Sequence, residues 1–337
     1  MGNVGNEISK MRQRNGSLDL LRIVAALMVV MIHCSSWFSF ISPSLEMSVD
    51  DTVIGCMVSS AVPLFFMISG CLLLDPTYNF NVRKWLKKIL KVLIIWAVWG
   101  AFYAVLQMDT FSLEKLVIWT FKGHFHFWFF EYLIGVYLLL PVLRALVVYE
   151  NGKYIKWFLL CWLLFGIVRY TLDGIQPGNS EIRIVTGKIH WEMCAFSGYY
   201  VLGYFLGNMS RHLNKWLLAC VYAVCVFVCC LVSGKDVFSV TTMSFTLPVV
   251  FEACAIFLLF VQMQVTSRKW LTSLSSATLG VYLMHPLVLE HMMPASIWYT
   301  VPWIRVVLVW AYVSGISILV SWLMNRIPVV RKWLLSI

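Results

Sequence analysis

Ten long apolar stretches constrain this chain more than any other feature of its sequence. They lie at residues 18–39, 53–75, 88–107, 127–148, 155–171, 192–208, 214–232, 243–264, 277–294 and 303–325. A helix crosses the hydrocarbon core of a bilayer with about 20 mainly apolar residues, and it satisfies its backbone hydrogen bonds within its own segment. The sequence therefore predicts an all-α fold, a polytopic membrane helical bundle with about 10 transmembrane helices.

The composition excludes several other classes of protein. Hydrophobic residues make up 61% of the chain and charged residues only 12%, whereas a soluble domain has about 25% charged residues. Disorder, a coiled coil and a nucleic-acid partner are excluded on this ground. No Cys-x-x-Cys pair occurs among the ten cysteines, so we expect no metal site. Membrane lipids are the partners that this composition predicts.

The basic residues predict the orientation of the bundle. With ten spans, 19 of the 26 Lys and Arg residues fall on the side that holds both termini. Cytoplasmic loops are enriched in Lys and Arg, so both termini are expected in the cytoplasm. We expect one membrane domain at 18–326, between an N-terminal segment at 1–17 and a short tail at 327–337. No internal repeat is evident, which argues against a transporter built from inverted halves.

The first apolar stretch carries three ionisable side chains that we interpret as functional. Asp19 and Arg22 are three residues apart and can pair on one helix face. Arg22 and His33 are eleven apart, which places them on one face and roughly 16 Å apart along the axis. A histidine at that depth suits general-base chemistry. The alternative is that Arg22 anchors the helix at the surface and His33 bonds a neighbouring helix.

Two features of the second stretch and of the segment after it have competing explanations. Ser69-Gly70 permits close packing of helices, which we favour over direct catalysis. Five basic residues then follow within nine positions, namely Arg83, Lys84, Lys87, Lys88 and Lys91. They could bind lipid headgroups or the phosphates of a soluble nucleotide cofactor.

Further ionisable residues lie near the fourth and ninth stretches. His124 and His126 precede Trp128, where aromatic residues often form only an interface belt. Glu131 lies deeper and needs a partner. Tyr282 and His285 are three apart on one face, and the alternative role for them is helix packing around Pro286. Glu192 and Glu252 are further carboxylates, for which only pairing with an intramembrane base is expected.

Taken in order, these motifs resemble the acyltransferase-3 family of integral membrane acyltransferases. The motifs are Asp-x-x-Arg, a His eleven residues after that Arg, PLFFMISG, HFWFF and GVYLMH, and the resemblance covers Ser17 to Arg326. Within the family the chain is most similar to short, stand-alone members such as the O-acetyltransferases of enterobacterial common antigen. Three positions depart from the family pattern, Ile23, Cys71 and Phe127. None of them is His33, so they bear on substrate choice and not on activity.

The resemblance implies a multi-pass enzyme of the bacterial plasma (inner) membrane. It implies transfer of an acetyl group from acetyl-CoA, the acyl donor, to a hydroxyl of a cell-surface carbohydrate or its lipid-linked precursor. Arg22 and His33 match the Arg-x10-His pair of the family, and His33 is its essential residue. His126 with Trp128 matches a His-x-Trp stretch, and Tyr282 with His285 matches a Tyr-x-x-His motif.

The leading hypothesis assigns a role to each candidate residue. The expected catalytic residues are His33, Arg22, Asp19, Tyr282 and His285. The expected cofactor-binding residues are Arg22, Arg83, Lys84, Lys87, Lys88 and Ser69. The expected substrate-binding residues are His126, Trp128 and Glu131. His33 either deprotonates the acceptor or carries the acyl group. The other hypotheses are a transporter for a polar small molecule and the membrane half of a larger cell-envelope enzyme.

Overall fold

The computed structural model describes residues 14–41, 49–168, 170–171, 195–209, 212–232, 244–293 and 302–335. All regular secondary structure in these residues is helical, and they contain no strand. The prediction of an all-α fold is therefore confirmed for the described chain.

Helices occupy each of the ten apolar stretches. The longer ones are α2 (Gly16–Ile41), α5 (Val82–Gln107), α7 (Trp128–Val148), α12 (Lys215–Val232), α14 (Leu247–Gln262), α15 (Lys269–His291) and α16 (Pro302–Met324). The shorter ones are α3 (Val49–Met57), α4 (Ala61–Leu73), α6 (Leu113–Lys122), α8 (Ile155–Trp162), α11 (Ala195–Gly207) and α17 (Pro328–Leu334). A 3-10 turn, η1 (Tyr149–Gly152), precedes α8, and a π-helical turn, η2 (Leu163–Val168), follows it.

Several of these helices have the length and composition of membrane spans. In the described chain, five helical segments qualify: Gly16–Trp37, Asp51–Leu73, Val82–Gln107, Trp128–Gly152 and Ile304–Met324. Three more are apolar but shorter: Ile155–Val168, Lys215–Leu231 and Leu247–Gln262. These helices indicate a multi-pass membrane protein. The count of ten spans and the side of the termini stay predictions.

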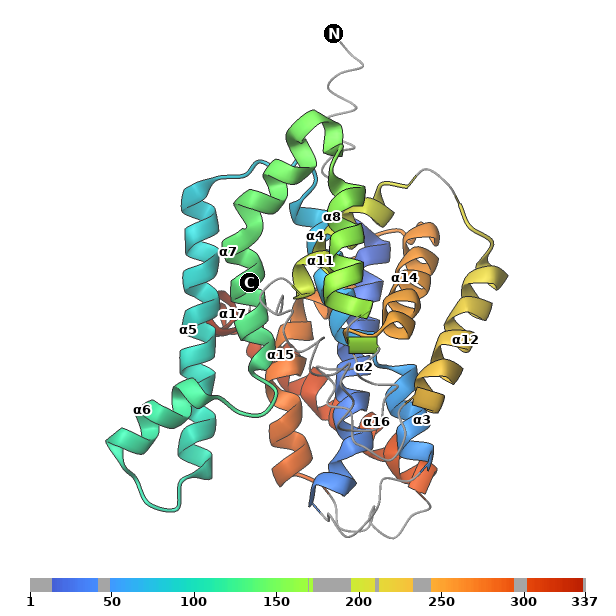
Figure 1. The fold of residues 1–337 in the computed structure, drawn as a ribbon. Helices are drawn as coiled ribbons and strands as arrows, with labels where there is room; N and C mark the ends of the chain where they lie inside the picture. The colour runs from blue at the N-terminus through green and yellow to red at the C-terminus, as the bar shows by residue number, and fades with distance from the viewer. Residues whose placement is uncertain are drawn as a thin grey trace, which may run out of the picture.

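Helix α2 lies in the middle of the bundle (Figure 1). It packs against α3, α4, α14, α15 and α16. Small residues on α2 allow this crowding, since Ala25 is fully buried and Ala26 nearly so. Protein therefore surrounds α2, with its ionisable residues, over much of the length of the helix.

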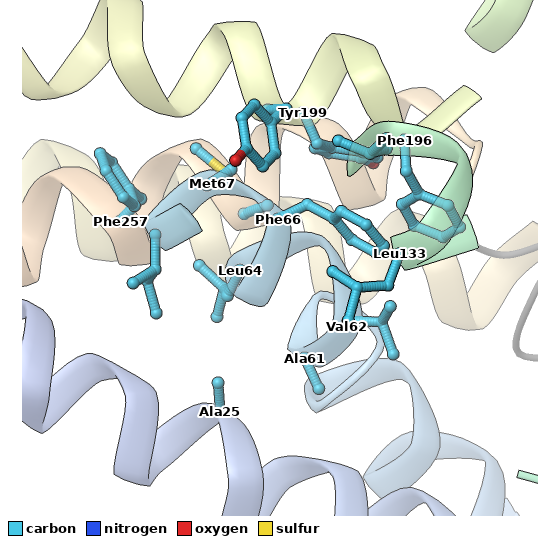
Figure 2. Close-up of a cluster of buried hydrophobic side chains, with 14 of the residues drawn as sticks. Ala25, Ala61, Val62, Leu64, Phe66, Met67, Leu133, Phe196, Tyr199 and Phe257 are labelled. Carbon is cyan, nitrogen blue, oxygen red and sulfur yellow. The ribbon is translucent and has the colours of Figure 1, made fainter. Parts of the chain in front are cut away.

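Helices α4 and α11 approach each other more closely than ordinary side chains permit. A Cβ atom added at Gly70 would lie 1.8 Å from the carbonyl oxygen of Tyr200, and one added at Gly203 would lie 2.1 Å from that of Met67. Around this contact, Phe66 stacks on Phe196 of α11 with ring centroids 4.4 Å apart (Figure 2). The structure thus supports the interpretation that Ser69-Gly70 permits close packing of helices.

The stretch at 53–75 is not one continuous helix, because the chain breaks between α3 and α4. At this break the fully buried carboxylate of Glu252 accepts hydrogen bonds from the hydroxyls of Ser59, at 2.8 Å, and Ser60, at 2.7 Å. These serines, and not the intramembrane base that we expected, are the partners of Glu252. Glu192, the other carboxylate, lies outside the described residues.

Two helices that the sequence did not predict pack against α5. Helix α6 begins after Ser112, whose hydroxyl accepts from the backbone of Lys115, and ends at Gly123, which has a φ of 73°. That φ is one that glycine adopts readily. Helix α17 lies within the predicted tail, and the indole of Trp99 donates to the carbonyl of Leu334 at 3.4 Å. The tail thus adds a helix to the bundle.

Candidate functional site

A cavity of about 630 Å³ lies beside α2, and residues of α2, α4, α5, α7 and α15 form most of its lining. This volume is in the range of pockets that bind small molecules. The predicted site residues that line it are Asp19, Arg22, His33, Ser69, Lys88, His126, Trp128 and Tyr282. The structure therefore brings together residues that are as much as 263 positions apart in the sequence (282 − 19).

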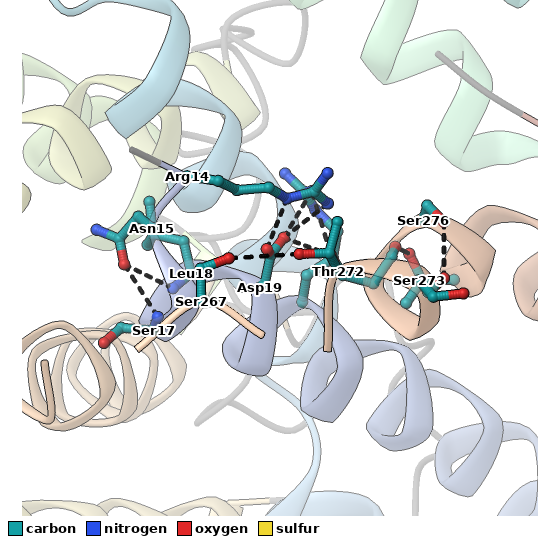
Figure 3. Close-up of polar contacts among 12 residues, drawn as sticks. Arg14, Asn15, Ser17, Leu18, Asp19, Ser267, Thr272, Ser273 and Ser276 are labelled. Atoms are coloured by element: carbon teal, nitrogen blue, oxygen red, sulfur yellow. Dashed lines mark hydrogen bonds and ion pairs between the residues drawn. The ribbon is translucent and has the colours of Figure 1, made fainter. Parts of the chain in front are cut away.

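One end of the cavity holds a network of charged and hydroxyl side chains (Figure 3). Asp19 is nearly fully buried and accepts two hydrogen bonds from Arg14, at 2.6 and 3.0 Å. The hydroxyl of Ser275 also donates to Asp19, at 2.7 Å. Arg22 is farther away, with Nη1 3.9 Å from Asp19 and 3.5 Å from Ser275. The expected Asp19–Arg22 pair thus exists, but Arg14 is the closer partner.

This arrangement leaves Arg22 able to bind an anion. Its side chain is 27% exposed and lines the cavity. A guanidinium has five N–H donors, so the long contacts to Asp19 and Ser275 leave donors for a ligand. No sequence spacing pointed to Arg14, because its five-residue separation from Asp19 is not a helical one.

His33 belongs to a group of aromatic rings in contact with one another. Its imidazole stacks on that of His285, with centroids 5.1 Å apart, and contacts Phe125 at the same distance. Tyr282 lines the cavity and its hydroxyl donates to the backbone carbonyl of His126. His285 is fully buried behind His33 and does not line the cavity. The Tyr-x-x-His pair therefore meets both His33 and the His-x-Trp segment.

Two partners of this group were missed by sequence reasoning. Nδ1 of His124 lies 3.0 Å from Nδ1 of His126, and Nε2 of His124 lies 3.1 Å from Oε1 of Glu290. Tyr103 of α5 stacks on His124, with centroids 4.3 Å apart. Glu290 and Tyr103 belong to different helices from each other and from the histidine segment. No spacing along the sequence could have revealed these contacts.

The basic cluster after the second stretch is divided by the structure. Lys88 is half-buried and lines the cavity, with Nζ 5.1 Å from the centroid of the Tyr137 ring. Arg83, Lys84 and Lys87 are exposed and do not line it. Of the five residues of the basic cluster, Lys88 therefore reaches the cavity and the other four do not.

Other cations gather beside the Asp19 end of the cavity. A second cavity of about 520 Å³ is lined by Arg14, Arg268, Lys269 and Arg331. Both cavities share Arg14 and Ser276 in their linings. This basic region was also missed from the sequence, since its members come from three separate segments.

The remaining predicted residues have different placements. Ser69 is half-buried in the cavity wall, and Trp128 lines the wall at the start of α7. Glu131 is exposed one turn later on α7 and does not line the cavity. The structure therefore gives no support to Glu131 as a residue that contacts a ligand in this cavity.

Comparison with known proteins identifies the family. Residues 15–326 match the family model of acyltransferase-3, described as an acyltransferase domain. The chain is also similar to an amino-acid racemase of Enterococcus faecalis, with 29% identity over 302 residues. That match covers 83% of this chain but 42% of the racemase, so the chain spans less than half of this curated relative. Neither match is to an enterobacterial common antigen enzyme, and no solved structure matches. The family match covers most of the chain, which therefore belongs to the acyltransferase-3 family.

Proposed function

We propose that this protein is a membrane O-acyltransferase that moves an acetyl group from acetyl-CoA to a hydroxyl of a cell-surface carbohydrate or of its lipid-linked precursor. The observation that carries the proposal is that one cavity has Arg22 and Lys88 in its wall together with His33, His126 and Tyr282. Cations suit the phosphates of a coenzyme, and imidazoles suit proton transfer from a hydroxyl. Membership of an acyltransferase family supports the reaction type.

Donor and acceptor occupy different parts of the cavity in this proposal. Arg22 and Lys88 hold the phosphates of acetyl-CoA, and the thioester extends past Ser69 toward His33. The exposed residues Arg83, Lys84 and Lys87 attract the anionic cofactor at the surface. His126 and Trp128 form the acceptor side. Because acetyl-CoA is a cytoplasmic metabolite, this assignment places the Arg22 end and both termini in the cytoplasm of a bacterial cell.

The reaction then needs one base and one leaving group. In direct transfer, His33 takes the hydroxyl proton, the hydroxyl oxygen attacks the thioester carbonyl, and the sulfur of coenzyme A leaves. In the two-step form, a ring nitrogen of His33 first accepts the acetyl group and passes it to the hydroxyl. His285 supports the His33 ring by stacking, and Tyr282 fixes the segment of His126 by its hydrogen bond.

Transfer from labelled acetyl-CoA to candidate glycans by the purified protein tests this function. His33→Ala is expected to lower turnover by about 10² to 10⁴, the typical loss for a general base, or more if His33 carries the acyl group. His212 is exposed and outside the cavity, so His212→Ala is the matched control and should keep wild-type turnover. More than half of wild-type turnover in His33→Ala would make His33 structural. If the well-folded wild type does not bind coenzyme A, the proposal that acetyl-CoA is the acyl donor is refuted.

One observation favours a second candidate, the membrane part of a larger cell-envelope enzyme. The racemase relative is more than twice as long as the region that this chain matches. A region related to this chain thus occurs within a longer protein. If the isolated chain binds acetyl-CoA but transfers no acetyl group to any glycan, this second candidate gains support.

A further inference from the structure

A line of hydrogen-bonding side chains runs from the cavity wall into the protein behind it. It begins at His126, which is 1% exposed and lines the cavity. Nδ1 of His126 lies 3.0 Å from Nδ1 of His124, and Nε2 of His124 lies 3.1 Å from the carboxylate of Glu290. The mechanism above uses His33 and gives neither His124 nor Glu290 a role.

The carboxylate at the end of this line fixes where the protons sit. A carboxylate only accepts hydrogen bonds, so Nε2 of His124 must donate to Glu290. A neutral imidazole has one N–H, so Nδ1 of His124 accepts, and Nδ1 of His126 donates to it. Nε2 of His126 is then left with a lone pair and no proton.

That nitrogen has an unusual environment in the structure. Nε2 of His126 is buried and has no hydrogen-bond partner among the described residues. A buried acceptor without a partner is costly and calls for an explanation. Because His126 lines the cavity, a hydroxyl bound there would supply the missing donor once the side chains that cover Nε2 move aside.

The surrounding rings hold this line of residues in place. Tyr103 stacks on His124 with centroids 4.3 Å apart, and its hydroxyl donates to the carbonyl of Leu283 at 2.8 Å. The ring of His285 lies 5.5 Å from that of His126 and 5.1 Å from that of His33. His126 is therefore held close to His33, which carries the acetyl group in the two-step form.

We propose that Nε2 of His126 accepts the proton of the acceptor hydroxyl, and that His124 and Glu290 are positioning residues for His126. This inference rests on the proposed acyl transfer in its two-step form, in which His33 carries the acetyl group and a second residue must take the hydroxyl proton. The hydroxyl oxygen bonds to the acetyl carbonyl carbon as the bond from that carbon to the leaving group breaks. The hydroxyl proton moves to Nε2 of His126 and then to the leaving group. That group is the ring nitrogen of His33 that carries the acetyl group.

Glu290 has two effects in this arrangement. Its hydrogen bond to His124 selects the ring tautomers, and its negative charge stabilises the imidazolium that forms on His126. A glutamine at position 290 keeps the first effect, because an amide oxygen still accepts from His124, and removes the second. The substitution thus separates the charge of Glu290 from its packing.

Steady-state kinetics with both substrates tests the proposal. Glu290→Gln should lower kcat about 10- to 100-fold and leave both KM values within about twofold of wild type. His124→Phe keeps the ring stacked on Tyr103 but breaks both hydrogen bonds, and it should lower kcat at least as much. The double variant should be no worse than the worse single variant, because the residues act as one unit. Glu114→Gln, at an exposed carboxylate of α6 outside the cavity, is the matched control and should keep wild-type kcat.

Nitrogen NMR of histidine-labelled protein gives a second readout that needs no activity. In the wild type and in Glu290→Gln, His126 should show a protonated Nδ1 and an unprotonated Nε2, and His124→Phe should lose this fixed tautomer. A wild-type kcat in Glu290→Gln, a change in KM alone, or multiplied losses in the double variant would overturn the proposal. If the wild type transfers no acetyl group, the proposed function fails, whereas the tautomer of His126 still tests the hydrogen-bonded line.

Discussion

The contact between α4 and α11 allows a strong prediction at Gly70. In Gly70→Ala the new methyl carbon would lie 1.8 Å from the carbonyl oxygen of Tyr200, whereas real contacts of this kind essentially never fall below 3.0 Å. The two backbones must therefore part by about 1.2 Å (3.0 − 1.8), which also loosens the contact of Gly203 with Met67. Alanine gains about 1 kcal/mol of helix propensity, but overpacking typically costs about 1–3 kcal/mol. A backbone atom cannot move aside as a side chain can, so we expect the cost near the upper end of this range. The free energy of unfolding should then fall by about 2 kcal/mol in total.

Thermal unfolding in detergent, followed by fluorescence-detected size exclusion, measures this loss as a fall in Tm of a few degrees. Gly135 on α7 is the matched control, because a Cβ added there has no atom within 4 Å. Gly135→Ala should leave Tm unchanged or raise it, since only the propensity term remains. Equal Tm values for Gly70→Ala and the wild type would refute the inference that these backbones are in contact. The Ser69-Gly70 motif would then need a different explanation.

Two further predictions concern the basic cluster and the buried carboxylate. Lys88→Ala should weaken coenzyme A binding about tenfold or more, as measured by calorimetry. Lys87→Ala, at an exposed position, should change the affinity by no more than about threefold. Equal effects would contradict the conclusion that Lys88, and not Lys87, lines the binding cavity. Glu252→Ala should lower Tm because it leaves the buried hydroxyl of Ser60 without its acceptor, at about 1–3 kcal/mol, and leaves that of Ser59 only the carbonyl of Cys56, 3.0 Å away. Glu252→Gln keeps an acceptor and should lower Tm less. An equal fall in Tm in both variants would show that the carboxylate charge, and not the hydrogen bonds, stabilises the break between α3 and α4.

Much of the candidate site could be predicted from the sequence because helical spacing is regular. The separation of eleven residues placed Arg22 and His33 on one face of one helix, and both line the same cavity. The motif order then brought in Tyr282, which also lines it. Lys88 and Lys87 were indistinguishable in the sequence, since both are lysines of one cluster. Which of them faces the cavity depends on how α5 is rotated against α7.

The sequence by itself determined the class of the fold, because long apolar stretches with few charges have few alternatives to membrane helices. It also determined which ionisable residues of α2 share a face. Only the tertiary structure decided the partners of those residues, such as Arg14 for Asp19 and Glu290 for His124. The physical reason is that a hydrogen bond between two helices depends on their rotation and separation. Those are set by packing across the whole bundle, including glycine contacts such as that of Gly70 with Tyr200, and no local pattern encodes them.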